Sequence, residues 1–207
     1  MSQRFPIAVL VSGRGTNLQA ILDAAGLPGY AAEIAAVISD RPGVQALDRA
    51  AAAGVPTEVV AWSDFPDRDS FTTAICDAAE RHGANALILA GFMRILAPVA
   101  IARFPHRIIN THPALLPAFP GAHAVTEALR HGVKLSGVTI HFVDEQVDHG
   151  PIIYQEAVPV HADDTDDTLQ ARIQAVEHLR YPEIVDAFAA GRLSVTGRVV
   201  AWDGDAP

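Results

Sequence analysis

The sequence predicts an α/β fold in which a Rossmann-like, mostly parallel sheet carries helices on both faces. In the first half of the 207-residue chain, short aliphatic runs alternate with segments of helical periodicity. This alternation is typical of parallel strands joined by crossover helices. Hydrophobic residues make up 50% of the chain but aromatic residues only 6%, and such aliphatic cores suit strands that are covered on both faces. Extended segments around tight turns in the second half predict antiparallel strands there.

The elements of the first half follow from hydrophobic runs and their spacing. Leu18, Ile21 and Leu22 recur at helical intervals, whereas the strand segments are continuous aliphatic runs. Gly54 and Gly83 follow two of the helical segments and end them. The predicted strands are 7–11, 34–39, 56–61, 86–90 and 107–110, and the predicted helices are 17–25, 45–53, 71–81 and 98–103.

The second half begins with a proline-rich loop and then changes character. Acidic residues at 164–167 suit the N-terminus of a helix whose apolar stripe includes Leu169, Ile173 and Val176. No linker or internal repeat divides the chain, so we expect a single domain over residues 1–207. The predicted elements are the loop 113–121, a helix 124–130, strands 137–143 and 151–160, the helix after 164–167 and a hairpin 193–202.

Composition and the absence of certain motifs narrow the function classes. The formal net charge is −9 and no run of Lys and Arg occurs, which argues against nucleic-acid partners. The N-terminus lacks the features of a signal peptide and no apolar stretch is long enough to cross a membrane, so we expect a cytoplasmic protein with no membrane partner. Because Cys76 is the one cysteine and no His-x-x-x-His pair occurs, we predict no metal site. The absence of a Gly-x-Ser-x-Gly motif disfavours a serine hydrolase.

A glycine loop, Gly13-Arg14-Gly15-Thr16-Asn17, joins the first predicted strand to the first helix. Glycines allow the backbone to turn tightly near a ligand, and the helix N-terminus offers free amides, so the loop is typical of a phosphate site. Thr16 or Asn17 can cap the helix or touch the ligand. Leu18 stands where a dinucleotide fingerprint needs its third glycine, which disfavours dinucleotide binding although Asp40 ends the second strand. A tight turn with a capped helix and no ligand is the alternative.

Two polar side chains follow the fifth predicted strand, at the edge where parallel sheets bind their ligands. Asn110 and His112 point to the same side of an extended segment, so an amide and a protonated imidazole can both donate to a developing oxyanion. Asp148, in a turn that ends with Gly150, can pair with His112, raise its pKa and keep it cationic, or accept a proton. The ordinary alternatives are a hydrogen-bonded surface histidine and a common turn aspartate.

Four separated blocks resemble the phosphoribosylglycinamide formyltransferase family of folate-dependent formyltransferases, in the same order across nearly the whole chain. The blocks are VSGRGTNL at 11–18, AGFMRIL at 90–96, NTHPALLP at 110–117 and GVTIHFV at 137–143. The resemblance implies transfer of the formyl group of 10-formyltetrahydrofolate, the co-substrate, to the amine of N1-(5-phosphoribosyl)glycinamide in de novo purine biosynthesis. It also implies small-molecule partners, no metal, and a monomer or homodimer. The nucleotide-phosphate half would span about 1–105, and the folate and catalytic half about 106–207.

The resemblance assigns roles residue by residue. Asn110, His112 and Asp148 match the catalytic trio. The residues that match the ribonucleotide site are Gly15, Thr16, Asn17, Arg68, Gln174, Ala175, Val176 and Glu177, the last of which would hold the amine. The residues that match the folate site are Met93, Arg94, Ile95, Leu96, Ile101, Ile108, Asn110, Asp144, Glu145, Gln146, Val147 and Asp148. Without the resemblance, Arg68 and Glu177 are ordinary solvated helix residues.

Two departures from the family pattern and three rival functions accompany the resemblance. Ala118 stands where the family usually carries a lysine, and His149 replaces a glycine, so a positive φ there would strain the backbone. The rivals are a 10-formyltetrahydrofolate hydrolase, a methionyl-tRNA formyltransferase and a non-catalytic nucleotide-binding module. The hydrolase usually adds an N-terminal regulatory domain and the tRNA enzyme a basic C-terminal domain, and the sequence predicts neither.

Overall fold

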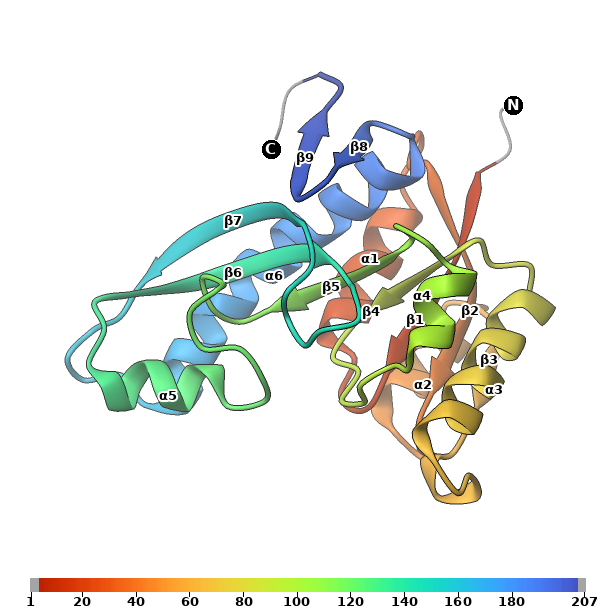
Figure 1. Cartoon of the computed structure of the whole chain (residues 1–207), viewed down its shortest axis with the longest axis horizontal. Helices are drawn as coiled ribbons and strands as arrows, with labels where there is room; N and C mark the ends of the chain where they lie inside the picture. The colour runs from red at the N-terminus through yellow and green to blue at the C-terminus, as the bar shows by residue number, and fades with distance from the viewer. Residues whose placement is uncertain (1–3, 205–207) are drawn as a thin grey trace.

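A mixed sheet forms the centre of the computed structural model, which describes residues 4–204. The strands are β1 (Phe5–Val11), β2 (Ala32–Ser39), β3 (Thr57–Val59), β4 (Ala86–Leu89), β5 (Ile108–His112), β6 (Leu135–Phe142), β7 (Ile152–Pro159), β8 (Leu193–Thr196) and β9 (Val199–Trp202). They form a 9-stranded sheet in the order β3-β2-β1-β4-β5-β6-β7-β9-β8 (Figure 1). The strands from β3 to β5 pair in parallel, whereas β6 is antiparallel to both β5 and β7.

Helices cover both faces of this sheet. They are α1 (Thr16–Ala25), α2 (Gln45–Ala52), α3 (Arg68–Arg81), α4 (Pro98–Arg103), α5 (Ala124–His131) and α6 (Asp166–Ala189), with a 3₁₀ turn η1 (Trp62–Asp64). Side chains of α1, α2, α5 and α6 belong to one hydrophobic cluster, and those of α3 and α4 to the other. The mostly parallel sheet, the helices on both faces and the antiparallel strands of the second half confirm the predicted fold class.

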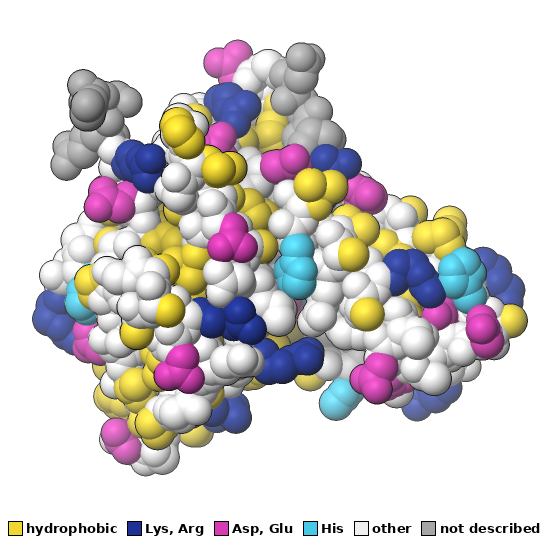
Figure 2. All heavy atoms as spheres, turned by 180° about the vertical axis from the view of Figure 1, so that it is seen from behind, with side chains coloured by type: hydrophobic (Ala, Val, Ile, Leu, Met, Phe, Trp, Pro, Cys, Tyr) yellow, Lys and Arg dark blue, Asp and Glu magenta, His cyan; other side chains and the backbone are white. Residues whose placement is uncertain are grey.

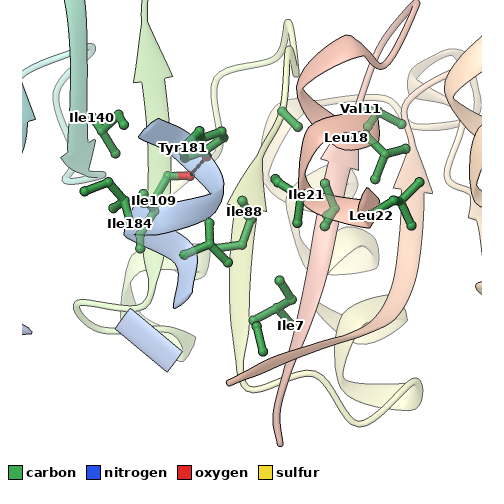
Figure 3. Packing of buried hydrophobic residues seen from close by; sticks show 14 of the residues in the cluster. Ile7, Val11, Leu18, Ile21, Leu22, Ile88, Ile109, Ile140, Tyr181 and Ile184 are labelled. Atoms are coloured by element: carbon green, nitrogen blue, oxygen red, sulfur yellow. Dashed lines mark hydrogen bonds between the residues drawn. The ribbon is translucent and has the colours of Figure 1, made fainter. Parts of the chain in front are cut away.

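Strand β1 shows how the sequence fills both layers of the core. Ile7, Val9 and Val11 are fully buried on the face that α1 and α6 cover (Figure 3). Ala8 and Leu10, which alternate with them, are fully buried on the face that α3 covers. Successive strand residues point to opposite faces, so a continuous aliphatic run is required wherever helices pack on both sides.

The differences from the predicted elements lie at their ends. The third strand is limited to Thr57–Val59, and a 3₁₀ turn that we did not predict follows it. The fifth strand extends to His112 because residues 109–112 pair with β6. Thr165 caps α6 by accepting a hydrogen bond from the amide of Thr168, and acidic residues occupy the first turn as predicted. Within residues 4–204, no helix is long and apolar enough to cross a membrane.

Tyr181 of α6 forms hydrogen bonds with both β4 and β5, two strands that end at the cavity described below. Its side chain is fully buried, and its hydroxyl lies 2.9 Å from the carbonyl oxygen of Leu89 in β4 and 3.0 Å from that of Ile109 in β5 (Figure 3). Burial raises the pKa of the Tyr181 phenol well above its usual 10.0, so the hydroxyl stays protonated. Its one hydrogen is shared between two carbonyl oxygens, which fixes α6 against the strand ends.

We expect Tyr181→Phe to lower the free energy of unfolding by about 1–3 kcal/mol, because two buried carbonyls lose their shared donor. Urea denaturation of both proteins measures the difference. Tyr154→Phe is the matched control, since the Tyr154 hydroxyl bonds Glu156, whose side chain is 33% exposed. Equal losses in the two variants would contradict this assignment.

Candidate active site

A cavity of about 630 Å³ opens at the carboxyl ends of β1, β4 and β5. Seen from behind, Arg and His side chains border a hollow near the middle of the molecule (Figure 2). The lining residues are 12–17, 89–96, 110–113, 121–122, 141, 143–148, 170, 174 and 177. Segments that are far apart in the sequence therefore meet at the edge of the sheet where parallel folds bind their ligands.

The glycine loop forms one wall of the cavity. Gly15 has a φ of 71°, and a Cβ there would lie 2.7 Å from the Cβ of Ala46, so only glycine fits. Gly15 is also the residue that precedes α1, and no side chain caps this helix. The expectation that Thr16 or Asn17 can cap α1 is thus not met, and the first amides of the helix keep their capacity to bind an anion.

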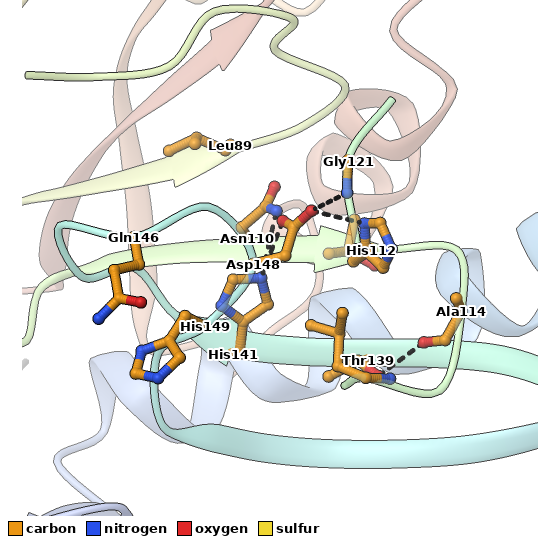
Figure 4. A network of polar contacts seen from close by, with 12 residues as sticks. Leu89, Asn110, His112, Ala114, Gly121, Thr139, His141, Gln146, Asp148 and His149 are labelled. Carbon is orange, nitrogen blue, oxygen red and sulfur yellow. Dashed lines mark hydrogen bonds and ion pairs between the residues drawn. The ribbon is translucent and has the colours of Figure 1, made fainter. Parts of the chain in front are cut away.

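Strand β5 presents different polar side chains on its two sides. Asn110 and His112 share one side, whereas Thr111 points to the other, because successive strand residues alternate. All three line the cavity. The side of Asn110 and His112 faces the loop that carries Asp148 (Figure 4), and the side of Thr111 faces Glu177 of α6.

Both ring nitrogens of His112 make polar contacts. Nε2 lies 2.8 Å from the carbonyl oxygen of Phe119, and Nδ1 lies 3.3 Å from Oδ2 of Asp148 (Figure 4). A carbonyl only accepts, so Nε2 carries a hydrogen. Burial lowers the pKa of His112 below its usual 6.5, and the Asp148 carboxylate and the Phe119 carbonyl only partly oppose this. The predicted pairing is confirmed, and Asp148 acts to raise the pKa of His112 as expected, but burial outweighs the carboxylate and the pKa is lowered overall.

Asp148 is anchored from three directions. Its Oδ2 accepts a hydrogen bond from the amide of Gly121 at 2.7 Å, and its Oδ1 lies 3.7 Å from Nε2 of His141. Burial raises the pKa of this carboxyl, but the contacts with His141, Gly121 and His112 outweigh burial and leave the pKa below the usual 3.8. Asp148 itself has a φ of 51°, a region that aspartate tolerates better than most residues. The condition for strain at His149 is not met, since the positive φ falls one residue earlier.

His141 is a further site residue, which the sequence presents only as a histidine that alternates with apolar residues in the block 137–143. Its side chain is 2% exposed. Nδ1 lies 2.9 Å from the carbonyl oxygen of Phe142, and Nε2 lies 3.3 Å from the Asn110 amide nitrogen and 3.7 Å from Oδ1 of Asp148. Alternation with apolar neighbours indicated burial of His141. It could not indicate the partners, which come from another strand and a distant loop.

Glu177 is a buried carboxylate on the other side of β5. The residue is only 4% exposed, and it accepts hydrogen bonds from Oγ1 of Thr111 at 2.9 Å and Nδ2 of Asn17 at 3.3 Å. Oδ1 of Asn17 is buried there without a hydrogen-bond partner. Burial raises the pKa of Glu177, and the two hydrogen bonds only partly oppose the rise. In the described part of the chain, no Lys, Arg or His side chain forms an ion pair with Glu177.

The predicted folate residues 93–96 and 144–148 all line the cavity. The amide of Met93 donates to Oγ of Ser12 at 2.8 Å, and Nε of Arg94 pairs with Oδ2 of Asp40 at 2.8 Å. Asp40 is the strand-end aspartate that a dinucleotide site would use for a ribose. Here its carboxylate is buried against Arg94 and fixes one wall of the cavity instead.

Five predicted site residues do not line the cavity. Ile108 is 1% exposed and lies in the hydrophobic cluster beneath the sheet, against which Ile101 packs. Arg68 is the exposed first residue of α3, and Ala175 and Val176 lie between the lining residues of α6 without joining the lining. Their roles remain predictions from the resemblance. Among residues 4–204, no group of three or more His, Cys, Asp or Glu could hold a metal ion.

Comparison with known proteins identifies the family. Residues 5–185 match the family model described as formyl transferase. The phosphoribosylglycinamide formyltransferase of Mycobacterium tuberculosis H37Rv is 45% identical over 192 residues, which are 93% of this chain and 88% of that protein. The trifunctional purine biosynthetic protein adenosine-3 of Gallus gallus is 41% identical over 194 residues, which are 94% of this chain but only 19% of that protein.

A solved structure shows the same fold over nearly the whole chain. The glycinamide ribonucleotide transformylase 1 of Symbiobacterium toebii superposes with a TM-score of 0.94 at 46% identity, covering 98% of this chain and 95% of that one. The fold and the site therefore define a transferase built on a Rossmann-like sheet. The chain belongs to the formyl transferase family.

We expect Glu177→Gln to become more stable relative to the parent protein as the pH rises from acid toward neutral. The pKa of Glu177 is raised in the folded state. The carboxyl therefore contributes stability below its unfolded pKa, and this contribution is lost as the pH rises through the folded-state value. Urea denaturation at several pH values measures the difference. Glu183→Gln, which removes a carboxylate that is 42% exposed on the same helix, is the matched control. A pH-independent difference for Glu177→Gln would contradict the assignment.

Proposed function

We propose that this protein transfers the formyl group of 10-formyltetrahydrofolate to the amine of N1-(5-phosphoribosyl)glycinamide, a step of de novo purine biosynthesis. The observation that carries the proposal is the cluster of Asn110, His112 and Asp148, which lies at one cavity together with a glycine loop. The names of the relatives from Mycobacterium tuberculosis and Symbiobacterium toebii support the choice of acceptor.

The transfer is a direct attack. The amine nitrogen forms a bond to the formyl carbon, and the formyl oxygen becomes an oxyanion. The bond from this carbon to N10 of the folate then breaks, and N10 takes up the proton that the attacking nitrogen releases. The protein supplies positioning and charge stabilisation, and no covalent intermediate with a side chain is needed.

Asn110 and His112 stabilise the oxyanion. The Asn110 amide nitrogen lies 3.3 Å from Nε2 of His141 and carries two hydrogens, so at least one is available to the formyl oxygen. Nε2 of His112 donates to the carbonyl of Phe119, so the formyl oxygen replaces this carbonyl or shares the hydrogen. Losing one such donor typically costs roughly 10²–10³ in kcat.

Asp148 controls the proton. Its carboxylate favours the charged form of His112 against the effect of burial. The contacts with His141 and Gly121 that lower the pKa of Asp148 keep it ionised at neutral pH. An ionised carboxylate beside the reacting atoms can accept the proton of the attacking nitrogen and pass it toward N10.

The far side of β5 binds the acceptor. The amides at the start of α1 take the phosphate, as the uncapped glycine loop allows. The buried carboxylate of Glu177 and the unpartnered Oδ1 of Asn17 are both acceptors. An amine donates to both and compensates the burial of the carboxylate.

The formyl donor covers exposed apolar side chains. Met93, Ile95 and Val147 line the cavity although they are 66%, 53% and 49% exposed. Such exposure of large apolar residues is typical of a binding surface. The pterin and benzoyl rings of the donor fit between the segments 93–96 and 144–148, where backbone groups can read the pterin edge.

A hydrolase with water as the acceptor is the second candidate. The oxyanion cluster serves both reactions equally, so it does not separate them. The glycine loop and Glu177 do, because a hydrolase has no phosphate and no amine to bind on that side of β5. The acceptor site therefore favours transfer to the ribonucleotide.

The proposal is tested by incubating the purified protein with 10-formyltetrahydrofolate in the presence and absence of the ribonucleotide. We expect consumption of the donor only when the ribonucleotide is present, with formation of the N-formyl product. Chromatography of both products measures the reaction. Loss of the donor in the absence of the ribonucleotide would establish the hydrolase instead, and no loss in either mixture would refute both enzymatic functions.

We expect Asp148→Asn to lower kcat by at least roughly 10²-fold, because the amide neither accepts the proton nor favours charged His112. The pKa of His112 should fall further, so the decline of kcat with rising pH should move to lower pH. Steady-state assays from pH 5 to 9 measure both effects. Asp163→Asn, which changes an exposed carboxylate that does not line the cavity, is the control. Near-normal turnover of Asp148→Asn would remove the role of Asp148.

A further inference from the structure

The loop 144–149 is tied to the C-terminal hairpin by Arg198. Gly197 and Arg198 form the turn between β8 and β9, since Thr196 pairs with Val199. From this turn, Nη2 of Arg198 donates to the carbonyl oxygen of His149 at 2.6 Å. The hairpin thus reaches the loop that forms one wall of the cavity, although it contributes no residue to the cavity lining itself.

Arg198 also contacts the ring of His149. Its Nη1 is 3.3 Å from both Nδ1 and Nε2 of the imidazole. The two amino groups of one guanidinium therefore hold the backbone carbonyl and the ring of the same residue. The single ammonium of lysine does not reproduce this forked geometry.

The ring of His149 also contacts the first residue of the loop. Its Nδ1 lies 2.7 Å from Oδ2 of Asp144, the first residue of the wall segment 144–148. The contacts therefore run from Arg198 through the ring of His149 to Asp144. This row of contacts, which we call the latch, joins both ends of the loop to the hairpin.

Other contacts hold the two ends of the loop unequally. Asp148 is fixed by Gly121, His112 and His141. In the first part of the loop, one hydrogen bond from the amide of Gln146 to Oδ1 of Asp144 is present, and residues 145–147 are exposed. Through Asp144, the latch connects the exposed residues 145–147 to the hairpin.

We propose that Arg198 and His149 are positioning residues for the formyl donor, acting by holding residues 144–147 in the shape that receives it. The identity of the donor rests on the function proposed above. Because Asp148 has its own anchors, the latch acts on donor binding and leaves the chemical step and the ribonucleotide site unchanged. Neither residue touches the cavity, so the effect passes through the loop.

We expect Arg198→Ala to raise the KM for the formyl donor about five-fold while kcat and the KM for the ribonucleotide change less than about two-fold. His149→Ala should give a similar rise, and the double variant should be no worse than either single variant, since both break one row of contacts. Arg198→Lys should not restore the KM, because one ammonium cannot contact both the carbonyl and the ring of His149 in the geometry of the guanidinium. Arg192→Ala is the matched control: it removes an arginine next to the same hairpin, where Arg192 pairs with Asp186 at 3.0 Å.

Hydrogen exchange of the free protein separates the latch from the proposed function. Amides 144–147 should exchange several-fold faster in Arg198→Ala than in the parent protein and in Arg192→Ala. If exchange rises but the parent protein does not consume the donor, the latch stands as a structural contact and the proposed function fails. Unchanged exchange, equal rises in both KM values, or additive effects in the double variant would overturn the latch.

Discussion

The buried pair of His112 and Asp148 is the interaction on which the site depends. Its strand, β5, is also the strand at which the sheet changes from parallel to antiparallel pairing. The parallel side delivers the glycine loop to the carboxyl ends of the strands. The antiparallel side delivers His141 opposite Asn110 and, beyond the end of β6, the turn with Asp148. Because β6 is antiparallel, it ends beside Ile109 near the start of β5, and the following residues run back along β5 before Asp148 meets His112.

Two buried carboxylates near β5 have pKa values that move in opposite directions. Asp148 receives the amide of Gly121 and faces two imidazoles, so these contacts overcome burial and its pKa falls. Glu177 receives one hydroxyl and one carboxamide, so burial prevails and its pKa rises. Divergent environments of this kind let one site hold two acids in different roles. In the proposed function, the low-pKa carboxylate stands beside His112, whose charged form it favours, and the high-pKa carboxylate stands where an incoming amine would compensate it.

The sequence predicts the fold and many of the residues that line the cavity. Aliphatic runs such as Ile7 to Val11 fix the buried strands, and the order of strands and helices then fixes the sheet edge at which Asn110 and His112 emerge. The burial of individual side chains was harder to predict, because it depends on partners from distant segments. Glu177 reads as a solvated helix residue because the partners that bury it lie on α1 and β5. The net pKa of His112 could not be predicted either, because it depends on how completely the loop 113–121 covers the ring.

That loop and the catalytic pair depend on each other. The carbonyl of Phe119 accepts from His112, and the amide of Gly121 donates to Asp148. Phe119 adopts a φ of 53° to present its carbonyl, which a bulky residue does only when surrounding contacts require it. A formyl oxygen that takes the hydrogen of Nε2 removes the reason for this conformation but leaves the anchor at Gly121 intact. In the proposed mechanism, the pair therefore exchanges one protein acceptor for the substrate while it keeps its carboxylate in place, and the donor needed in the transition state is oriented before the substrate arrives.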